Sequence, residues 1–220
     1  LITVVGTFFN LMFSALLAYP LSVKTLPYRR QITFFVFFTM LFNGGLVPTY
    51  LMYVNYFHIK NTIWALIIPN LLLSANNVLM IRSYFMTSIP EALYEAAKID
   101  GAGQLRIFAQ IILPISKPII ATIALFAAFG YWNDWFQASL YISDKNLQTL
   151  QSMLNNIQNN IEYIANNPYG GLSLQQYKAS MPTESVRMAI AIIIVVPIAC
   201  VYPFFQKYFI SGLTIGSVKG

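Results

Sequence analysis

Few side chains in this sequence of 220 residues could carry out chemistry on their own. The chain has one histidine, His58, and one cysteine, Cys200, which is too few for a catalytic triad or a cysteine metal cluster. It contains no nucleotide-binding G-x-x-x-x-G-K-[ST] loop, no H-E-x-x-H zinc motif and no G-x-S-x-G nucleophile motif. The sequence therefore argues against an enzyme and predicts no metal ion or cofactor bound by this chain.

Charged and polar residues are instead concentrated in one stretch, residues 89–118, between long apolar runs. At its start Ser88 and Glu91 have the S-x-x-E spacing of a capping box, and the proline between them suits the first turn of a helix. Gly101 suits the left-handed turn that ends a helix, because glycine has no Cβ to clash there. The pattern predicts a short helix that begins near Ile89 and ends at Gly101.

A second short helix is expected after this turn, which Gly103 should loosen further. Leu105, Phe108 and Ile112 recur at helical spacing and predict its inward face. Pro114 then removes a backbone N–H and is expected to close the helix. The polar stretch is thus predicted to be two short helices joined by a glycine elbow.

The spacing within this stretch resembles a known motif. Glu95-Ala96-Ala97 is followed by three residues and Gly101, and then by nine residues and Ile111-x-Leu113-Pro114. This pattern resembles the EAA motif of bacterial ABC importer permeases. The longer phrase EAAKIDGAG is similar to the carbohydrate-uptake branch of these permeases, the maltose and lipo-oligosaccharide permease family.

The resemblance implies a MetI-like permease helix bundle in which the region 88–114 forms cytoplasmic coupling helices that insert into a cleft of an ATPase subunit. Small residues would let that partner approach closely. The docking residues implied in this way are Glu91, Glu95, Ala96, Ala97, Asp100, Gly101, Leu113 and Pro114. The family also implies a sister permease subunit, so a heterodimer, and an extracytoplasmic solute-binding protein. ATP and Mg²⁺ would bind to the partner ATPase and not to this chain.

The composition predicts the elements that must hold this motif. The chain is 57% hydrophobic and only 9% charged, which is typical of an integral membrane protein in contact with lipid. Uncharged runs long enough for membrane helices predict an all-α protein with five visible spans. These runs are residues 1–23, 31–57, 61–81, 118–133 and 188–206. Gly44 and Gly45 should kink the second span, and Pro197 and Pro203 should break the fifth.

The cations predict how the spans are oriented. The loop after the first span holds three, residues 82–117 hold four and the tail holds two, so nine of the thirteen would be cytoplasmic. The net charge of +6 is then a set of loop charges that orient the protein, not a nucleic-acid surface. The prediction is a multi-pass protein of the bacterial inner membrane with a cytoplasmic C-terminus. The resembled permeases have six spans, so a first span is expected to be missing. Residues 1–220 form one membrane domain.

Polar side chains at the spans are candidates for a substrate pathway. Amides are costly in lipid and should face protein or water, either along a path or in a helix seam. Trp and amide side chains suit an uncharged, hydroxyl-rich ligand, which favours a sugar. The candidates are Asn70, Asn76, Asn77, Trp132, Asn133 and Trp135. Two alternatives stay open: an importer permease for peptides or amino acids, and a channel-like or scaffolding membrane protein without ATP coupling.

A polar segment outside the membrane, residues 136–185, is too long for a simple connection. Apolar residues recur at helical spacing in its first part, from Leu147 to Ile161, and predict an amphipathic helix over 147–164. In the resembled permeases an outer loop contacts the binding protein. The same role is expected here, although a helix that only covers the mouth of the bundle is the alternative.

Overall fold

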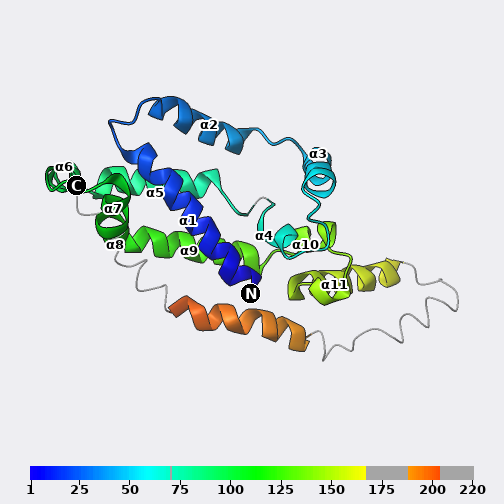
Figure 1. The fold of residues 1–220 in the computed structure, drawn as a ribbon. Coiled ribbons are helices and arrows are strands. Elements are labelled where there is room, and N and C mark those ends of the chain that lie inside the picture. Colours follow the sequence, from blue (N-terminus) through cyan, green and yellow to red (C-terminus); the bar gives the residue numbers. More distant parts are fainter. Residues whose placement is uncertain (70, 167–187, 204–220) are drawn as a thin grey trace.

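Every element of the described chain is helical, as the sequence predicts. The computed structural model describes residues 1–69, 71–166 and 188–203. Three helices, α1 (Ile2–Ser22), α5 (Ala75–Ser88) and α9 (Lys117–Trp132), form its centre, and α1 lies against the other two (Figure 1). The other elements are α2 (Arg29–Leu41), α3 (Leu46–Leu51), η1 (Met52–Tyr56), α4 (Trp64–Ile67), α6 (Glu91–Ile99), α7 (Gln104–Ile107), η2 (Phe108–Ile112), α8 (Leu113–Ile115), α10 (Phe136–Tyr141), η3 (Lys145–Leu147), α11 (Leu150–Asn166) and a last helix over Met188–Pro203.

Small side chains let α1 approach its neighbours. Gly6, Asn10, Ser14 and Ala18 recur every four residues and are all buried. A Cβ on Gly6 would lie 2.5 Å from the ring of Tyr131 on α9, so this close approach requires glycine. At about 1.5 Å per residue, α1 is long enough for a hydrocarbon core of roughly 30 Å. It is the one straight helix within the described ranges that meets the length and hydropathy of a span, and two bent pairs raise the number to three.

One predicted span is bent, and a second bend lies just before the predicted span 118–133. The helix α2 meets the α3–η1 pair at 108°, and Gly45 at this break has φ +90°, so the predicted glycine kink is confirmed. The segment from α7 to α8 meets α9 at 82° around Ser116. The prediction that Pro114 closes the helix is wrong, because Pro114 lies in the first turn of α8, where its missing N–H costs little.

The third apolar run is not one continuous span. The helix α4 ends at Ile67, and α5 begins only at Ala75, because Pro69 cannot continue the helical hydrogen bonding. Side chains from other helices satisfy carbonyls freed by the break. Asn10 Nδ2 donates to Leu71 O at 2.6 Å, and Tyr131 Oη donates to Ile67 O at 2.9 Å. Irregular backbone inside a membrane is tolerated where protein groups pair with it in this way.

The described asparagines of this run have different surroundings. Asn77 is 8% exposed and its Nδ2 donates to Asn10 Oδ1 at 3.1 Å, whereas Asn76 is exposed. For Asn77 this placement favours the seam alternative, with the seam inside the chain between α1 and α5. Asn70, which was grouped with them, lies outside the described residues.

This difference gives a matched pair of variants. Asn77→Leu should lower the midpoint of thermal unfolding in detergent, because Asn10 loses a buried partner, at a cost of about 1–2 kcal/mol. Asn76→Leu makes the same chemical change at an exposed site and should leave the midpoint nearly unchanged. Equal midpoints for the two variants would contradict a structural role for the Asn10–Asn77 hydrogen bond.

The end of the molecule away from α6 is built from short helices after α9. Asp134 Oδ1 accepts hydrogen bonds from the backbone N–H groups of Phe136 and Gln137, both at 3.1 Å, and so caps α10. The predicted amphipathic helix is confirmed as α11. Its Ile157 is buried against Ile190 and Ile194 of the last helix, so the apolar face of α11 covers protein.

The last helix continues through Pro197, so the predicted break at that proline is wrong. Cys200 on this helix is an exposed free cysteine. The second part of the outer segment, the residues after Pro203 and the predicted cytoplasmic tail lie outside the described residues.

Candidate functional site at the α6–α7 elbow

The polar stretch forms the predicted pair of short helices, α6 and α7, joined by a turn; we call residues 91–107 the elbow. The helix α6 begins at Glu91, with Pro90 as its N-cap residue, and no side chain caps it. The predicted capping box is wrong, because Ser88 is the last residue of α5. Glu91 instead pairs with Lys24 at 2.5 Å, and its charge in the first turn also suits the helix dipole.

The end of α6 is confirmed at Gly101, which has φ +74°. The N–H of Ala102 donates to Ala97 O at 2.9 Å, and the N–H of Gly101 donates to Lys98 O at 3.0 Å. These two bonds are those of a Schellman motif. No atom of the described residues lies within 4 Å of a Cβ built on Gly101, so the backbone angle, not the space, requires glycine. Gly103 has φ −69°, which any residue adopts, and is not part of the left-handed turn.

The inward face of the second helix differs from the prediction. Ile107, Phe108 and Ile112 are buried, whereas Leu105 is 76% exposed. Leu105 lies in α7, before the π-helical turn η2, and the buried side is set by Ile107, Phe108 and Ile112. Spacing by 3.6 residues per turn therefore placed Leu105 on the wrong face.

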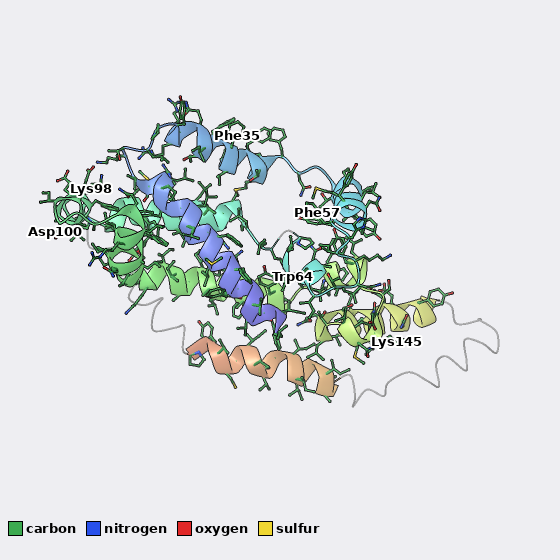
Figure 2. All side chains as sticks on the ribbon, viewed as in Figure 1. Phe35, Phe57, Trp64, Lys98, Asp100 and Lys145 are labelled. Carbon is green, nitrogen blue, oxygen red and sulfur yellow. The ribbon has the colours of Figure 1, made fainter. Side chains whose placement is uncertain are left out.

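The helix α6 has a side that packs into the protein, a side that faces outward and a third side that lines a cavity. Ala97, expected on the partner-facing surface, is its one buried residue and packs into the protein's own core. Ala92, Ala96 and Ile99 face outward, and Ile99 is 86% exposed. Lys98 and Asp100 lie at the edge of the molecule, far from Lys145 (Figure 2). The elbow thus presents small and apolar side chains to whatever binds it.

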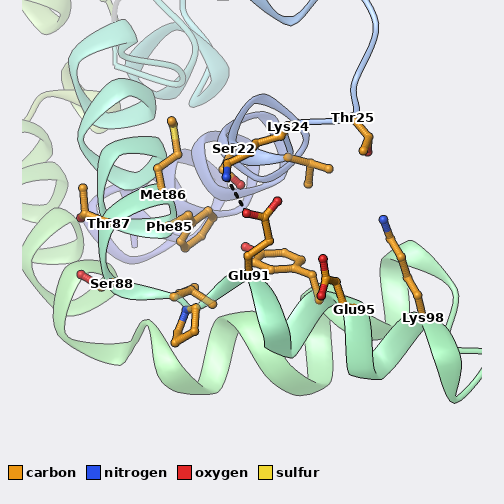
Figure 3. A pocket seen from close by; sticks show the side chains of 14 residues that line it. Ser22, Lys24, Thr25, Phe85, Met86, Thr87, Ser88, Glu91, Glu95 and Lys98 are labelled. Carbon is orange, nitrogen blue, oxygen red and sulfur yellow. Dashed lines mark hydrogen bonds and ion pairs between the residues drawn. The ribbon is translucent and has the colours of Figure 1, made fainter.

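The third side of α6 lines a cavity of about 520 Å³ between the ends of α1 and α5 (Figure 3). Glu91, Glu95 and Lys98 contribute to its wall, opposite Lys24. The Lys24–Glu91 ion pair is more than half exposed, so it contributes at most about 1 kcal/mol to folding. This side of α6 is therefore held only weakly.

The remaining motif residues are spread out. Asp100 and Gly101 are exposed at the elbow together with Glu95 and Ala96. Leu113 is partly buried against the core, and Pro114 is exposed on α8. The structure therefore brings the first part of the motif together on one surface and uses its end to turn the chain into α9.

The aromatic residues proposed for the pathway lie at the other end of α9. Trp132 Nε1 donates to Ile194 O at 3.0 Å, which joins α9 to the last helix. Asn133 Nδ2 donates to Phe129 O at 3.0 Å, and Asn133 Oδ1 accepts from Gln151 on α11 at 3.3 Å. Trp135 is 43% exposed. Of these three residues, Trp132 contacts the last helix, Asn133 contacts α11, and Trp135 is partly open to solvent.

Sequence reasoning missed the contacts that α1 makes with the elbow. Tyr19 is 7% exposed, and its hydroxyl donates to Gln104 Oε1 at 2.8 Å. Its ring lies 6.4 Å from that of Tyr94 and 5.1 Å from that of Phe108. Burial raises the pKa of the Tyr94 hydroxyl, so this neighbour is uncharged. No local pattern marks Tyr19, because its partners are far away in the sequence.

The elbow and the helices that hold it are shared with known proteins. Residues 3–215 match the family described as the binding-protein-dependent transport system inner membrane component. The chain belongs to this family. The resemblance inferred from Glu95 to Pro114 and the predicted permease helix bundle are thereby confirmed.

Relatives within this transport family match over the whole chain. Protein LplC of Bacillus subtilis (strain 168) is 42% identical over 219 residues, which cover 100% of this chain and 72% of that protein. The polygalacturonan/rhamnogalacturonan transport system permease protein YtcP of the same organism is 39% identical and covers 100% of this chain and 74% of its own. Among solved structures, a bacterial ABC transporter involved in the import of the acidic polysaccharide alginate matches with a TM-score of 0.78 and 31% identity, over 94% of this chain and 71% of that chain.

Proposed function

We propose that this chain is the permease subunit of an ATP-binding-cassette importer for carbohydrate, with oligosaccharide as the substrate class. The observation that carries the proposal is the elbow, an exposed surface of small and apolar side chains held by a Schellman turn, in a member of a binding-protein-dependent transport family. Relatives named for polygalacturonan/rhamnogalacturonan and for melibiose, raffinose and stachyose, and the alginate importer, support the substrate class.

The elbow would dock on a separate ATPase subunit, which binds ATP and Mg²⁺ and hydrolyses the nucleotide. Closure of the ATPase would then move the elbow and the spans attached to it. The described side chains offer no group of three or more residues that could hold a metal ion.

A sister permease and an extracytoplasmic binding protein would complete the importer. The helix α2 has no buried residue and exposes Phe34, Phe35 and Phe38, which fits a hydrophobic neighbour such as lipid or the sister subunit. Lys24 and Lys98 line one cavity at the elbow, so the positive-inside rule favours a cytoplasmic position for this end. The segment 136–185, whose described part lies at the opposite end, would contact the binding protein.

Transport in proteoliposomes tests this proposal. The permease is purified with an ATPase, a sister permease and a binding protein from the same organism, and uptake of labelled oligosaccharides, peptides and amino acids is measured. We expect ATP-dependent uptake of an oligosaccharide, and none with an ATPase variant that cannot hydrolyse ATP. Uptake of peptides or amino acids in its place would contradict the substrate class, and uptake that needs no ATP would contradict the importer mechanism.

A further inference from the structure

The last turns of α1 contact both halves of the elbow through one side chain. The ring of Tyr19 stacks against Tyr94 of α6, with an angle of 15° between the ring planes, and lies against Phe108 of η2. The hydroxyl of Tyr19 donates to Gln104 at the start of α7. Tyr19 therefore joins three consecutive elements of the polar stretch to a membrane helix.

The other half of α1 contacts the broken third span. Asn10 donates to the freed carbonyl of Leu71 and accepts from Asn77, and Gly6 lies against the ring of Tyr131. Nine residues separate Tyr19 from Asn10, about 13 Å along a continuous helix. The helix α1 thus links the elbow directly to the irregular backbone between α4 and α5.

Few other buried contacts with the described residues hold α6. Ala97 is its one buried residue, and the cavity of about 520 Å³ leaves its Glu95 and Lys98 side unpacked against the α1–α2 loop. The ion pair from Glu91 is exposed. The stacked pair of Tyr19 and Tyr94 is therefore a major attachment of α6 to α1.

We propose that Tyr19 is a positioning residue that transmits movement of the elbow to α1, and through α1 to the backbone break between α4 and α5. When an ATPase moves the elbow, the Tyr94 and Phe108 rings and the Gln104 amide carry Tyr19 with them. The helix α1 then shifts, and the carbonyl contact from Asn10 shifts the break. This inference rests on the proposed function.

The test is the amount of sugar transported per ATP hydrolysed, measured with the complete importer in proteoliposomes. Tyr19→Leu removes the ring contacts and the hydrogen bond, and should lower this ratio about tenfold, within the range for mutations along a coupling network. Tyr19→Phe keeps the rings and should lower it by about twofold to threefold. Tyr28→Phe is the control, because it removes a hydroxyl from a 73% exposed tyrosine in the α1–α2 loop, and should leave the ratio unchanged.

Gln104→Ala provides a second measurement that does not depend on packing, since Gln104 is exposed. It should lower the ratio as much as Tyr19→Phe does. The proposal is overturned if Tyr19→Leu assembles and keeps the wild-type ratio, or if neither Tyr19→Phe nor Gln104→Ala changes it. A loss of uptake and ATPase activity in equal proportion also overturns it, because coupling is then intact. If the wild-type importer shows no ATP-dependent uptake, the proposed function itself fails. If the wild type transports and the variants keep its ratio, only the role of Tyr19 fails.

Discussion

Replacement of Gly101 by valine is expected to abolish ATP-driven uptake. Gly101 has φ +74°, and a left-handed backbone costs about 1–2 kcal/mol for an ordinary residue and more for a β-branched one. The chain can relieve this strain only by opening the turn that aligns α6 with α7. The two Schellman hydrogen bonds would then be lost, and α6 and α7 would no longer present one continuous surface at the elbow. Uptake, and the stimulation of ATPase activity by the loaded binding protein, are measured in proteoliposomes. Both should fall at least about tenfold if it costs 1.4 kcal/mol or more to bring α6 and α7 back into line.

Two controls separate backbone strain from lost space. Gly101→Asn adds a side chain, but asparagine tolerates the left-handed region, and no described atom lies within 4 Å of the new Cβ. This variant should keep most of the activity. Gly103→Val introduces the same valine two residues later, where the backbone is extended and the space is open, and should also remain active. Normal uptake by an assembled Gly101→Val importer would show that the turn does not transmit movement.

Local signals predicted those parts of the fold that depend on a single segment. The charge-free length before Val23 identified α1, the glycine pair identified the break after α2, and the period of Leu147 to Ile161 identified α11. Gly101 was identified because no other residue type suits its backbone angle so well. In each case the signal and the structure it specifies lie within one turn or one helix.

The start of α6 shows how a correct motif can mislead. Ser88 and Glu91 have the spacing of a capping box, yet they belong to two different helices. Pro90 disfavours helical angles for the residue before it, and Ile89 accordingly has φ −108° and ψ 115°. This restriction could have been read from the sequence, and it would have placed the helix start after Pro90.

Contacts between distant segments could not be predicted from the sequence. Leu105 is exposed although Phe108 and Ile112, at helical spacing from it, are buried, and nothing local in the sequence indicates this difference. Likewise, the roles of Tyr19 and Asn10 depend on partners 85 and 61 residues away. Asn10 was not predicted as a contact residue, although a lone amide in an apolar helix is a recognised sign of an interhelical hydrogen bond.

Exposed apolar side chains beside the elbow lead to the second large expected effect. Ile99 is 86% exposed and Leu105 is 76% exposed, although their neighbours Lys98, Asp100 and Arg106 are charged. Large apolar side chains surrounded by charge on an otherwise polar segment are typical of an interface with another protein. We therefore expect Ile99 and Leu105 to be central contacts of the ATPase subunit.

Ile99→Asp should weaken binding of the ATPase subunit at least about tenfold, because truncation of a central interface residue commonly costs more than 1–2 kcal/mol and the new charge would be desolvated. The affinity is measured by titration of the labelled ATPase onto the permease pair in nanodiscs. Leu105→Asp should have the same effect. Neither side chain packs inside the chain, so the thermal unfolding midpoint of the permease should not change.

The control for the added charge is Tyr28→Asp. Tyr28 is 73% exposed, lies in the α1–α2 loop and has φ 59°, an angle that aspartate tolerates. It places the same negative charge outside the elbow, so binding of the ATPase should change less than about threefold, as expected for a rim position. Wild-type affinity in Ile99→Asp and Leu105→Asp would show that the ATPase binds elsewhere. Equal weakening by all three variants would point to general electrostatic repulsion and not to an apolar contact at the elbow.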